Sequence, residues 1–461
     1  MDLLIKQIDI LGLYSARNYS IRFDDNNLIL VGENGSGKTT ISRIIYAVLS
    51  CNWDLLRTYP FDRIIIYFKE NTVEVNSRTL NSIYSMQNAD RIGIYHERFY
   101  SRKSFVTNII SSILELRNEK EFSNEIRFRR VHGIPYEYFS EILESDEVNA
   151  LVDLTQSIKQ NFDPQILYLP TYRRIEEQLQ NIFPDIDLQK IERNRKPLKN
   201  NRVIELIEFG MDDVQILVNK ESDRLRSFSQ ERQSKLTLGY LEEIVSKTYE
   251  ESSAYKKIRN LSNDEIQKVL SRIDSTILSE TKKNELLNII NDFRNTSKHS
   301  YAGQVKILCH YFMQLWEFNN EINKSENNIR SFVEIVNKYL VNNRVIYDSE
   351  KYTCEVYNIL QNNSNNEEKR LEKINFQDLS SGEKQIVSLF SHLFLDDNDS
   401  VFVFIDEPEL SLSVDWQKSL LPDIATSPKF SGLLATTHSP FVFDNELESA
   451  VHGINEFLIL G

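Results

Sequence analysis

The sequence is poor in several residue types, and each shortage narrows what the protein can be. Its 461 residues include only three cysteines, thirteen glycines and ten prolines. Cys51, Cys309 and Cys354 are far apart and form no CxxC pair, which argues against a disulfide framework or a zinc site. We expect all three to be buried as small apolar residues in a reducing cytoplasm.

Long apolar runs and a basic charge balance are absent as well. No apolar stretch approaches the roughly 20 residues that span a bilayer. Asp2, Lys6 and Asp9 interrupt the N-terminal apolar pattern, which makes it a poor secretory signal. The formal net charge is −14, whereas a protein dedicated to nucleic acid usually carries a basic balance. We therefore expect a cytoplasmic protein without a membrane partner, for which direct nucleic-acid binding stays open.

What is present begins with a glycine-rich string that predicts a phosphate-binding loop. Residues 32–39 match GxxxxGK[ST], with a short apolar run before them and apolar residues at helical spacing after them. In such a strand, loop and helix, the backbone N–H groups and the helix dipole both favour a bound phosphate. We expect Lys38 to reach the β- and γ-phosphates and the Thr39 hydroxyl to ligate Mg²⁺. The other nucleotide contacts expected from this loop are Gly32, Asn34, Gly35, Ser36, Gly37 and Thr40.

A pair of carboxylates ends a second apolar run, at residues 401–405. Asp406 and Glu407 follow that run directly, and successive residues of a strand point to opposite sides. We therefore expect Asp406 to hold Mg²⁺ and Glu407 to act as the general base that polarises the attacking water. An acidic pair at a strand end is common on its own, so its weight here comes from its occurrence together with a phosphate loop.

A third motif, residues 379–385 (LSSGEKQ), admits two interpretations. Ser380 and Glu383 have the spacing of an ordinary helix capping box. A capping box does not require Gly382, nor a leucine before the serine. A cap alone therefore leaves Gly382 and Leu379 unexplained, and a helix N-terminus also suits an anion.

Taken in this order, the three motifs resemble those of the ABC-type ATPases, which include the SMC, RecF, RecN and OLD-like heads. The resemblance implies ATP and Mg²⁺ as cofactors. It also implies that the signature motif of one subunit completes the nucleotide site of another, through Ser380, Ser381, Gly382 and Glu383. A histidine after the next strand contacts the γ-phosphate in these proteins, and His438 follows the expected strand at 433–437. The implied catalytic residues are thus Lys38, Glu407 and His438.

Three further elements of such ATPases have weaker counterparts. Residues 410–412 occupy the position of the D-loop, which lies at the subunit interface in relatives. Gln165 is the candidate for the Q-loop glutamine, which links the nucleotide to a moving lobe. The turn at residues 14–17 is expected to contact adenine, although its aromatic residue could equally belong to the core.

The order of the expected elements predicts an α/β fold, an ABC-type P-loop NTPase head with an inserted helical domain. Strands are expected at residues 2–10, 27–31, 63–68, 71–75, 91–95 and 165–169, and strands return after residue 344. Between them the chain is polar, poor in glycine and helical in period, with Ile322, Ile329 and Val336 seven residues apart. That seam covers fewer than three heptads, which favours a short hairpin or bundle over an extended coiled coil. The predicted division is an N-terminal lobe (1–177), a helical insertion (178–343) and a C-terminal lobe (344–461).

A narrower resemblance rests on softer strings, Tyr168–Glu176 and Glu208–Val214, and on the size of the chain. These resemble the OLD-like ATPases of bacterial anti-phage defence, most closely the AriA family of PARIS systems. The resemblance implies a homo-oligomer built on head-to-head dimers. Such an ATPase holds a separate TOPRIM-type nuclease inactive and releases it when a phage anti-restriction protein is sensed.

Other classes stay open. A Septu-type ATPase paired with an HNH nuclease would have nearly the same architecture. A DNA-repair ATPase of the RecF or RecN kind would need a basic face, and a transporter ATPase a membrane partner. The net charge weighs against the former and the helical insertion against the latter. A purely structural or binding protein is the weakest interpretation, because Lys38, Asp406 and Glu407 are all present.

Two basic features receive no single assignment. Arg173 and Arg174 could pair with a phosphate, with Glu176 or with a partner subunit. The run at residues 190–202 (KIERNRKPLKNNR) could bind nucleic acid or an acidic protein, and a solvated loop explains it as well.

Overall fold

The structure of the chain is a computed structural model, which describes residues 3–81, 106–107, 110–111, 113–114, 145–170, 203–206, 211–246, 257–272, 279–295, 303–360, 370–410 and 412–459. It forms two compact units, Met1–Gly210 with Asp397–Gly461, and Met211–Asp396. The expected strand at 91–95, Arg173 and Arg174, and the basic run at 190–202 lie outside the described residues. The division into two lobes and a helical insertion stays a prediction.

The first unit contains a six-stranded parallel sheet in the order β13-β3-β12-β11-β6-β7. Its central strands are continuous apolar runs, as expected for parallel strands covered on both faces. The expected strands at 27–31 and 165–169 are confirmed. In chain order the strands are β3 (Asn27–Val31), β6 (Gln165–Leu169), β7 (Val203–Glu205), β11 (Val401–Asp406), β12 (Phe430–Thr437) and β13 (Val451–Gly453).

A five-stranded antiparallel sheet completes this unit, in the order β14-β2-β1-β4-β5. The first expected strand, at 2–10, begins and ends three residues later than predicted. The strands are β1 (Ile5–Leu13), β2 (Arg17–Arg22), β4 (Arg63–Phe68), β5 (Thr72–Asn76) and β14 (Leu458–Ile459).

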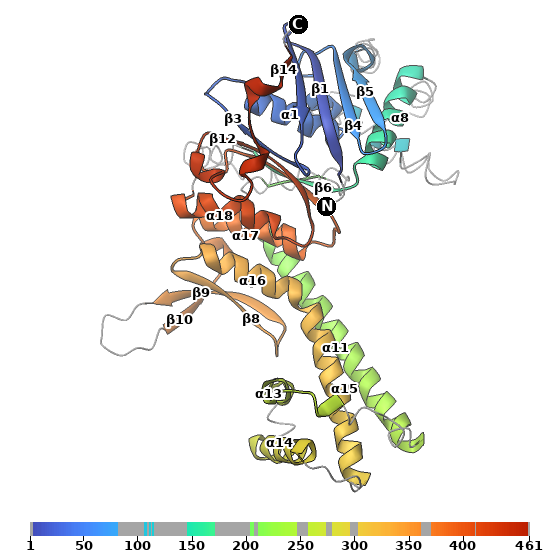
Figure 1. Cartoon of the computed structure of the whole chain (residues 1–461), viewed down its shortest axis with the longest axis vertical. Coiled ribbons are helices and arrows are strands. Elements are labelled where there is room, and N and C mark those ends of the chain that lie inside the picture. Colours follow the sequence, from blue (N-terminus) through green and yellow to red (C-terminus); the bar gives the residue numbers. More distant parts are fainter. Residues whose placement is uncertain are drawn as a thin grey trace, which may run out of the picture. The chain divides into compact units, whose positions relative to one another are not determined.

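Helix α1 (Lys38–Leu49) lies between the two sheets (Figure 1). One buried apolar cluster joins residues of both sheets to its buried face. Helix α18 packs against β12, and it connects β11 to β12. Other helical elements that the structure describes in this unit include α2 (Trp53–Leu56), α8 (Asp146–Asn161), α18 (Val414–Ala425) and the 3-10 turns η4 (Pro440–Val442), η5 (Glu448–Ala450) and η6 (Ile454–Phe457).

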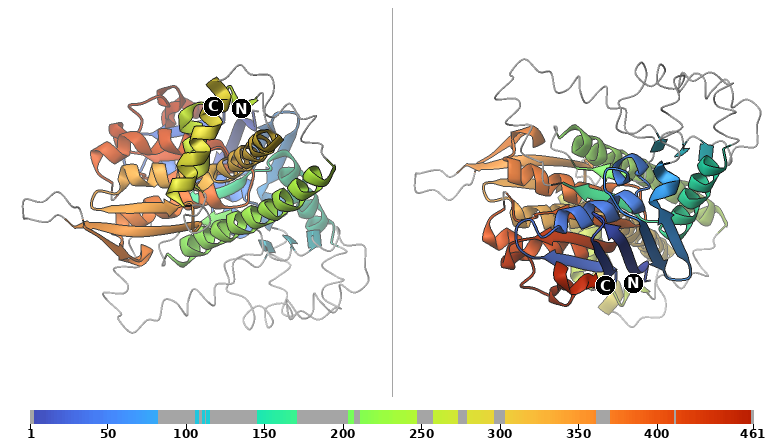
Figure 2. Two further views of the ribbon diagram at one scale, coloured as in Figure 1. Left: turned by 90° about the horizontal axis from the view of Figure 1, so that it is seen from below. Right: turned by 90° about the horizontal axis from the view of Figure 1, so that it is seen from above.

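The second unit is built around a long inserted helix, α11 (Asp212–Ser246), which runs as one uninterrupted rod (Figure 2). Helix α15 (Gly303–Ser325) packs along it, although α13 (Asn263–Ser271) and α14 (Glu280–Asn295) separate the two helices in the chain. Helices α13 and α14 form a small apolar core with α15. The combination of parallel and antiparallel sheets with a long inserted helix confirms the predicted α/β class.

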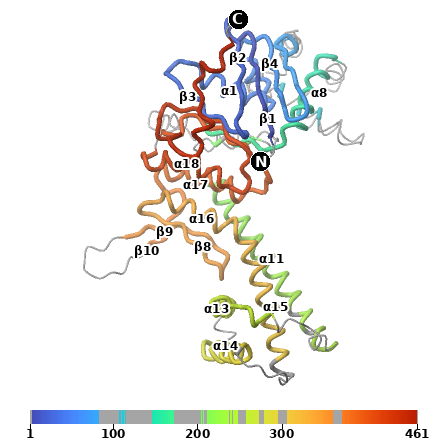
Figure 3. Tube along the Cα trace, in the orientation of Figure 1, coloured from blue at the N-terminus to red at the C-terminus, as the bar shows by residue number. Residues whose placement is uncertain are grey.

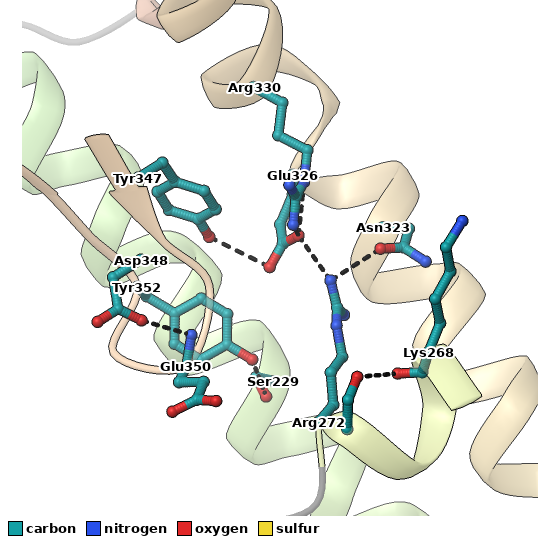
Figure 4. Close-up of polar contacts among 11 residues, drawn as sticks. Ser229, Lys268, Arg272, Asn323, Glu326, Arg330, Tyr347, Asp348, Glu350 and Tyr352 are labelled. Atoms are coloured by element: carbon teal, nitrogen blue, oxygen red, sulfur yellow. Dashed lines mark hydrogen bonds and ion pairs between the residues drawn. The ribbon is translucent and has the colours of Figure 1, made fainter. Parts of the chain in front are cut away.

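The apolar residues spaced seven apart lie on two helices and not on one. Helix α15 ends at Ser325 and α16 (Asn327–Tyr339) begins two residues later, and the trace continues from one helix into the next (Figure 3). Ile322, Ile329 and Val336 are all buried. Glu326, between the two helices, is fully buried (Figure 4). Its Oε2 accepts hydrogen bonds from Arg272 at 3.0 Å and from Arg330 at 2.6 Å, and its Oε1 accepts one from the Tyr347 hydroxyl at 3.2 Å.

A three-stranded antiparallel sheet and one further helix complete the second unit. The sheet has the order β10-β9-β8, with β8 (Asn343–Asp348), β9 (Thr353–Leu360) and β10 (Arg370–Ile374). The 3-10 turn η3 (Phe376–Asp378) leads into α17 (Ser381–Leu395), which packs against α11 and α16. Helix α17 carries the LSSGEKQ motif at its N-terminal end.

Candidate active site

The predicted motifs of the first unit meet at one edge of its parallel sheet. Neighbouring parallel strands point the same way, so their carboxyl ends share an edge, which is where open α/β sheets bind ligands. In the register, Val31 lies opposite Thr437, Asp406 opposite Thr436, and Ile405 opposite Leu169. The phosphate loop, His438 and the two carboxylates therefore leave the sheet at the same edge.

The phosphate loop has the backbone that glycine permits. Gly35 has a φ of 79° and Gly37 a φ of 102°, values in the left-handed region that side chains rarely adopt. Gly37 is the residue from which α1 starts, so the helix N-terminus follows the loop at once. Ser36 Oγ is buried without a hydrogen-bond partner among the described residues. An unpaired buried hydroxyl in such a loop fits a site for an anion.

The predicted loop residues differ in exposure. Gly32, Asn34 and Gly35 are exposed, and Ser36, Gly37, Thr39 and Thr40 are half-buried. Lys38 is buried, and its Nζ donates to the carbonyl oxygens of Gly32 at 2.8 Å and Glu33 at 3.1 Å. Burial lowers the pKa of the Lys38 ammonium, while the carboxylates of Glu407 and Glu409 act in the opposite direction. The ammonium thus lies in the loop, within the field of two acidic side chains.

Asp406 is fully buried at the end of β11, and two hydroxyl groups hold it. Tyr168 donates to its Oδ2 and Thr436 to its Oδ1, each at 3.0 Å. Burial raises the pKa of Asp406, and the hydrogen bonds from Tyr168 and Thr436 oppose that effect. Oxygen ligands of this kind suit Mg²⁺.

The backbone of Glu407 departs from the extended conformation of β11, so its side chain does not simply take the next face of the strand. Its φ is 51°, in the left-handed region, where a non-glycine residue is uncommon. Its backbone N–H donates to the carbonyl oxygen of Thr436 at 2.8 Å, which ties the turn to β12. Left-handed outliers of this kind cluster at functional sites. The half-buried side chain therefore leaves the sheet from a turn, and not from an extended strand as the sequence predicted.

His438 directly follows β12 and is exposed, and an acidic residue fixes its backbone. Glu409 accepts the His438 N–H through Oε1 and the Thr437 hydroxyl through Oε2, each at 2.8 Å. The sequence interpretation missed Glu409. The only local signal was that Glu409 stands two residues after the carboxylate pair, in the string DEPE (406–409). Its hydrogen-bond partners are 28 and 29 residues further along the chain, so the sequence did not indicate them.

The signature motif lies in the second unit, at the start of α17. Ser380 and Ser381 are exposed, whereas Gly382 and Glu383 are buried. Glu383 Oε2 accepts the Ser380 N–H at 3.0 Å and the Ser380 hydroxyl at 2.8 Å. Asn343 of β8 donates to Glu383 Oε1 at 3.1 Å. The local geometry is therefore that of a capped helix start, and the phosphate contacts of this motif stay predictions.

The three weaker candidates have different outcomes. Gln165 lies at the start of β6, opposite Val401, and its Oε1 accepts from Asn398 at 2.8 Å. That is the amino edge of the sheet, away from Asp406, so its position does not support a Q-loop role. The turn at 14–17 presents Tyr14, with 57% of its surface exposed, and the adenine contact stays a prediction. Of the D-loop position, Ser411 lies outside the described residues.

The sequence also did not reveal Arg43, which contacts the tyrosine that holds Asp406. Arg43 of α1 forms hydrogen bonds with the hydroxyl groups of Tyr168 and Tyr59. From the sequence, Tyr168 was noted only as the first residue of Tyr168–Glu176, one of the strings on which the resemblance to anti-phage ATPases rests. Tyr168 and Asp406 are 238 residues apart, so no local pattern could have joined them.

A phosphate loop and an Asp–Glu pair at one sheet edge define the class of P-loop ATPases. The chain belongs to the family described as "AAA domain, putative AbiEii toxin, Type IV TA system", whose model matches residues 28–444. It is therefore an ATP-binding P-loop ATPase, and the family implies ATP hydrolysis. A comparison with curated proteins gives no match.

Several solved structures are similar in fold, all at low identity. The Smc head domain with an extended coiled coil bound to the C-terminal domain of ScpA, from Pyrococcus furiosus, is 14% identical, with 95% of this chain and 90% of that chain covered and a TM-score of 0.35. The SmcHead bound to the C-winged helix domain of ScpA is 12% identical, with the same coverage and a TM-score of 0.33. The Smc head domain with a coiled coil and joint from Pyrococcus yayanosii is 15% identical, with 95% and 93% covered and a TM-score of 0.29. With scores this low, the fold assignment rests on the strand order.

No helix in the described part of the chain combines the length and the apolar character that a bilayer crossing requires.

Proposed function

We propose that this chain hydrolyses ATP at composite sites, each formed by the phosphate loop of one subunit and the signature helix of another. The observation that carries the proposal is the shared sheet edge at which the phosphate loop, Asp406, Glu407 and His438 emerge. The start of α17 supports a role for the signature helix in the composite site. Ser380 and Ser381 are exposed at a helix N-terminus, which suits an anion bound to another subunit.

Each residue at this edge has a distinct task in the proposed reaction. Lys38 moves from the loop carbonyls to the β- and γ-phosphates, where its charge counters theirs. Glu407 accepts a proton from the attacking water. His438 donates a hydrogen bond to the γ-phosphate. Thr39 and Asp406 would hold Mg²⁺, which when bound neutralises phosphate charge.

The biological role that we propose is the ATPase subunit of an anti-phage defence complex of the PARIS type. In this proposal a homo-oligomer keeps a separate TOPRIM-type nuclease inactive and releases it on sensing a phage protein. The family description, which names a type IV toxin–antitoxin system, supports a function in defence. The sequence resemblance to the AriA family supports the narrower assignment.

Mixing two inactive variants tests the composite site. Lys38→Ala removes the phosphate lysine, and Ser380→Arg blocks the signature helix. If the site is shared, a mixed dimer contains one intact site, formed by the loop of the Ser380→Arg subunit and the signature of the Lys38→Ala subunit. We expect each variant alone to be inactive and the mixture to regain a measurable fraction of phosphate release. A mixture as inactive as its components, despite proven subunit exchange, would exclude a shared site.

The partner is tested by purifying the tagged chain from its native operon. Co-purification of a TOPRIM-type nuclease supports the proposed role. An HNH nuclease in its place would favour the Septu-type alternative, and DNA-stimulated hydrolysis with no nuclease would favour a repair ATPase.

A further inference from the structure

Asp406 is held on both carboxylate oxygens by neutral hydroxyl donors. Tyr168 occupies one lone pair of Oδ2 and Thr436 one lone pair of Oδ1, each at 3.0 Å. A carboxylate has about four lone-pair positions, so these two donors do not by themselves exhaust the capacity of Asp406 to accept. The two donors fix the plane of the carboxylate and therefore the direction of the lone pairs that remain.

The direction of the Tyr168 proton is determined by its other partner. Arg43 can only donate hydrogen bonds, so the Tyr168 oxygen accepts from Arg43. A carboxylate can only accept, so the Tyr168 proton must point toward Asp406.

The Tyr168 ring has little freedom to turn away. It is buried and stacks on Tyr46 of α1, with ring centroids 4.3 Å apart and an interplanar angle of 26°. It also meets Phe404 edge to face, with centroids 6.5 Å apart. Phe404 lies opposite Tyr168 in the register and on the same face of β11 as Asp406. The ring therefore lies across β11, with its hydroxyl directed at Asp406.

We propose that Tyr168, oriented by Arg43, is a positioning residue that aims the Asp406 carboxylate at the catalytic metal. This inference rests on the proposed function, because it gives Asp406 the role of metal ligand. In this proposal Tyr168 acts only through its hydrogen bond to Asp406 and contacts neither the nucleotide nor the metal. Its effect is to present one oxygen lone pair of Asp406 in a single direction, as hydrogen-bonded partners of metal-ligating carboxylates do.

The test is Tyr168→Phe, which removes the hydroxyl and keeps the ring stacked on Tyr46. We expect the Mg²⁺ concentration for half-maximal ATP hydrolysis to rise about tenfold. ATP binding without added metal should stay within about twofold of the wild type, because Tyr168 does not contact the nucleotide. Thr436→Val removes the second donor and should shift the Mg²⁺ requirement in the same direction. It serves as the test if Tyr168→Phe fails to fold.

Tyr67→Phe is the matched control. Tyr67 hydrogen-bonds Asp9 in the antiparallel sheet, so this variant also removes a tyrosine–aspartate contact, away from Asp406. Its Mg²⁺ requirement should equal that of the wild type. An unchanged Mg²⁺ requirement in folded Tyr168→Phe and Thr436→Val, with an active wild type, would overturn this inference alone. A wild type without metal-dependent hydrolysis would overturn the proposed function and the inference together.

Discussion

Glu409 holds the backbone of His438, because its Oε1 accepts the His438 N–H at 2.8 Å. The same carboxylate accepts the Thr437 hydroxyl through Oε2, and the Ser439 N–H donates to Thr437 Oγ1 at 3.0 Å. One side chain from the turn after β11 therefore shapes the turn after β12. It connects the segment that carries Glu407 to the segment that carries the switch histidine.

We predict that Glu409→Ala lowers kcat by up to about 100-fold, because small misplacements of a catalytic group are costly. ATP affinity should not fall, since the variant removes a carboxylate near Lys38. Glu409→Gln should recover part of the rate, because its amide oxygen can still accept the His438 N–H. Steady-state phosphate release and nucleotide titration measure both quantities. Glu446→Ala, at an exposed site in the same unit, is the control. A normal kcat in Glu409→Ala would show that His438 needs no such support.

We predict that Glu407→Gln lowers the rate of ATP hydrolysis at least about 100-fold by removing the general base. Binding of ATP should persist, because Lys38 and the loop are intact, so the variant should accumulate in its ATP-bound oligomeric state. Single-turnover hydrolysis and size-exclusion chromatography with ATP and Mg²⁺ give the two readouts. Glu448→Gln, an exposed glutamate of the same unit, should behave as the wild type. Equal hydrolysis by Glu407→Gln and the wild type would remove Glu407 from catalysis.

We predict that Glu326→Ala destabilises the protein by about 3 kcal/mol, because it leaves Arg272 and Arg330 without their shared buried carboxylate. Glu321→Ala on the preceding helix, α15, breaks an ion pair with Arg232, in which both side chains are more than 40% exposed. That control should cost no more than about 1 kcal/mol. Denaturant unfolding followed by circular dichroism compares the two. Equal losses would mean that the Glu326 contacts add nothing beyond a surface pair.

We predict a pH-dependent stability that originates partly at His392 of α17. Burial lowers the pKa of His392, but the hydrogen bond with Asp213 and the nearby carboxylate of Asp396 outweigh it, and the pKa is raised. The charged form is therefore favoured by folding. Its contribution is complete below the ordinary histidine pKa of about 6.5 and is lost as the pH rises through the raised value.

His392→Gln should accordingly lower the melting temperature below pH 6.5, and the difference from the wild type should shrink as the pH rises. His452 also has a raised pKa, through Asp24 and Glu456, and titrates in the same direction. The difference between variant and wild type removes that common background. A difference that is constant with pH would exclude a charged His392 in the folded protein.

Much of the fold and part of the site could be predicted from local patterns. The apolar run at 27–31, the glycines after it and the helical spacing beyond Lys38 placed β3, the phosphate loop and α1, because these elements depend on nearby residues. The heptad seam correctly marked buried positions such as Ile322 and Ile329, but it did not reveal the interruption at Glu326. That interruption involves Arg272 and Tyr347, which come from other elements.

The sequence alone determined which chemical groups the site contains, namely a phosphate loop, an aspartate, a glutamate and a histidine at strand ends. Only the tertiary structure decided how those groups are supported, through Tyr168 and Thr436 on Asp406 and through Glu409 on His438. The physical reason is the register of the parallel strands. Register is set by packing between segments that are far apart in the chain, and a shift of one residue would turn every side chain to the opposite face.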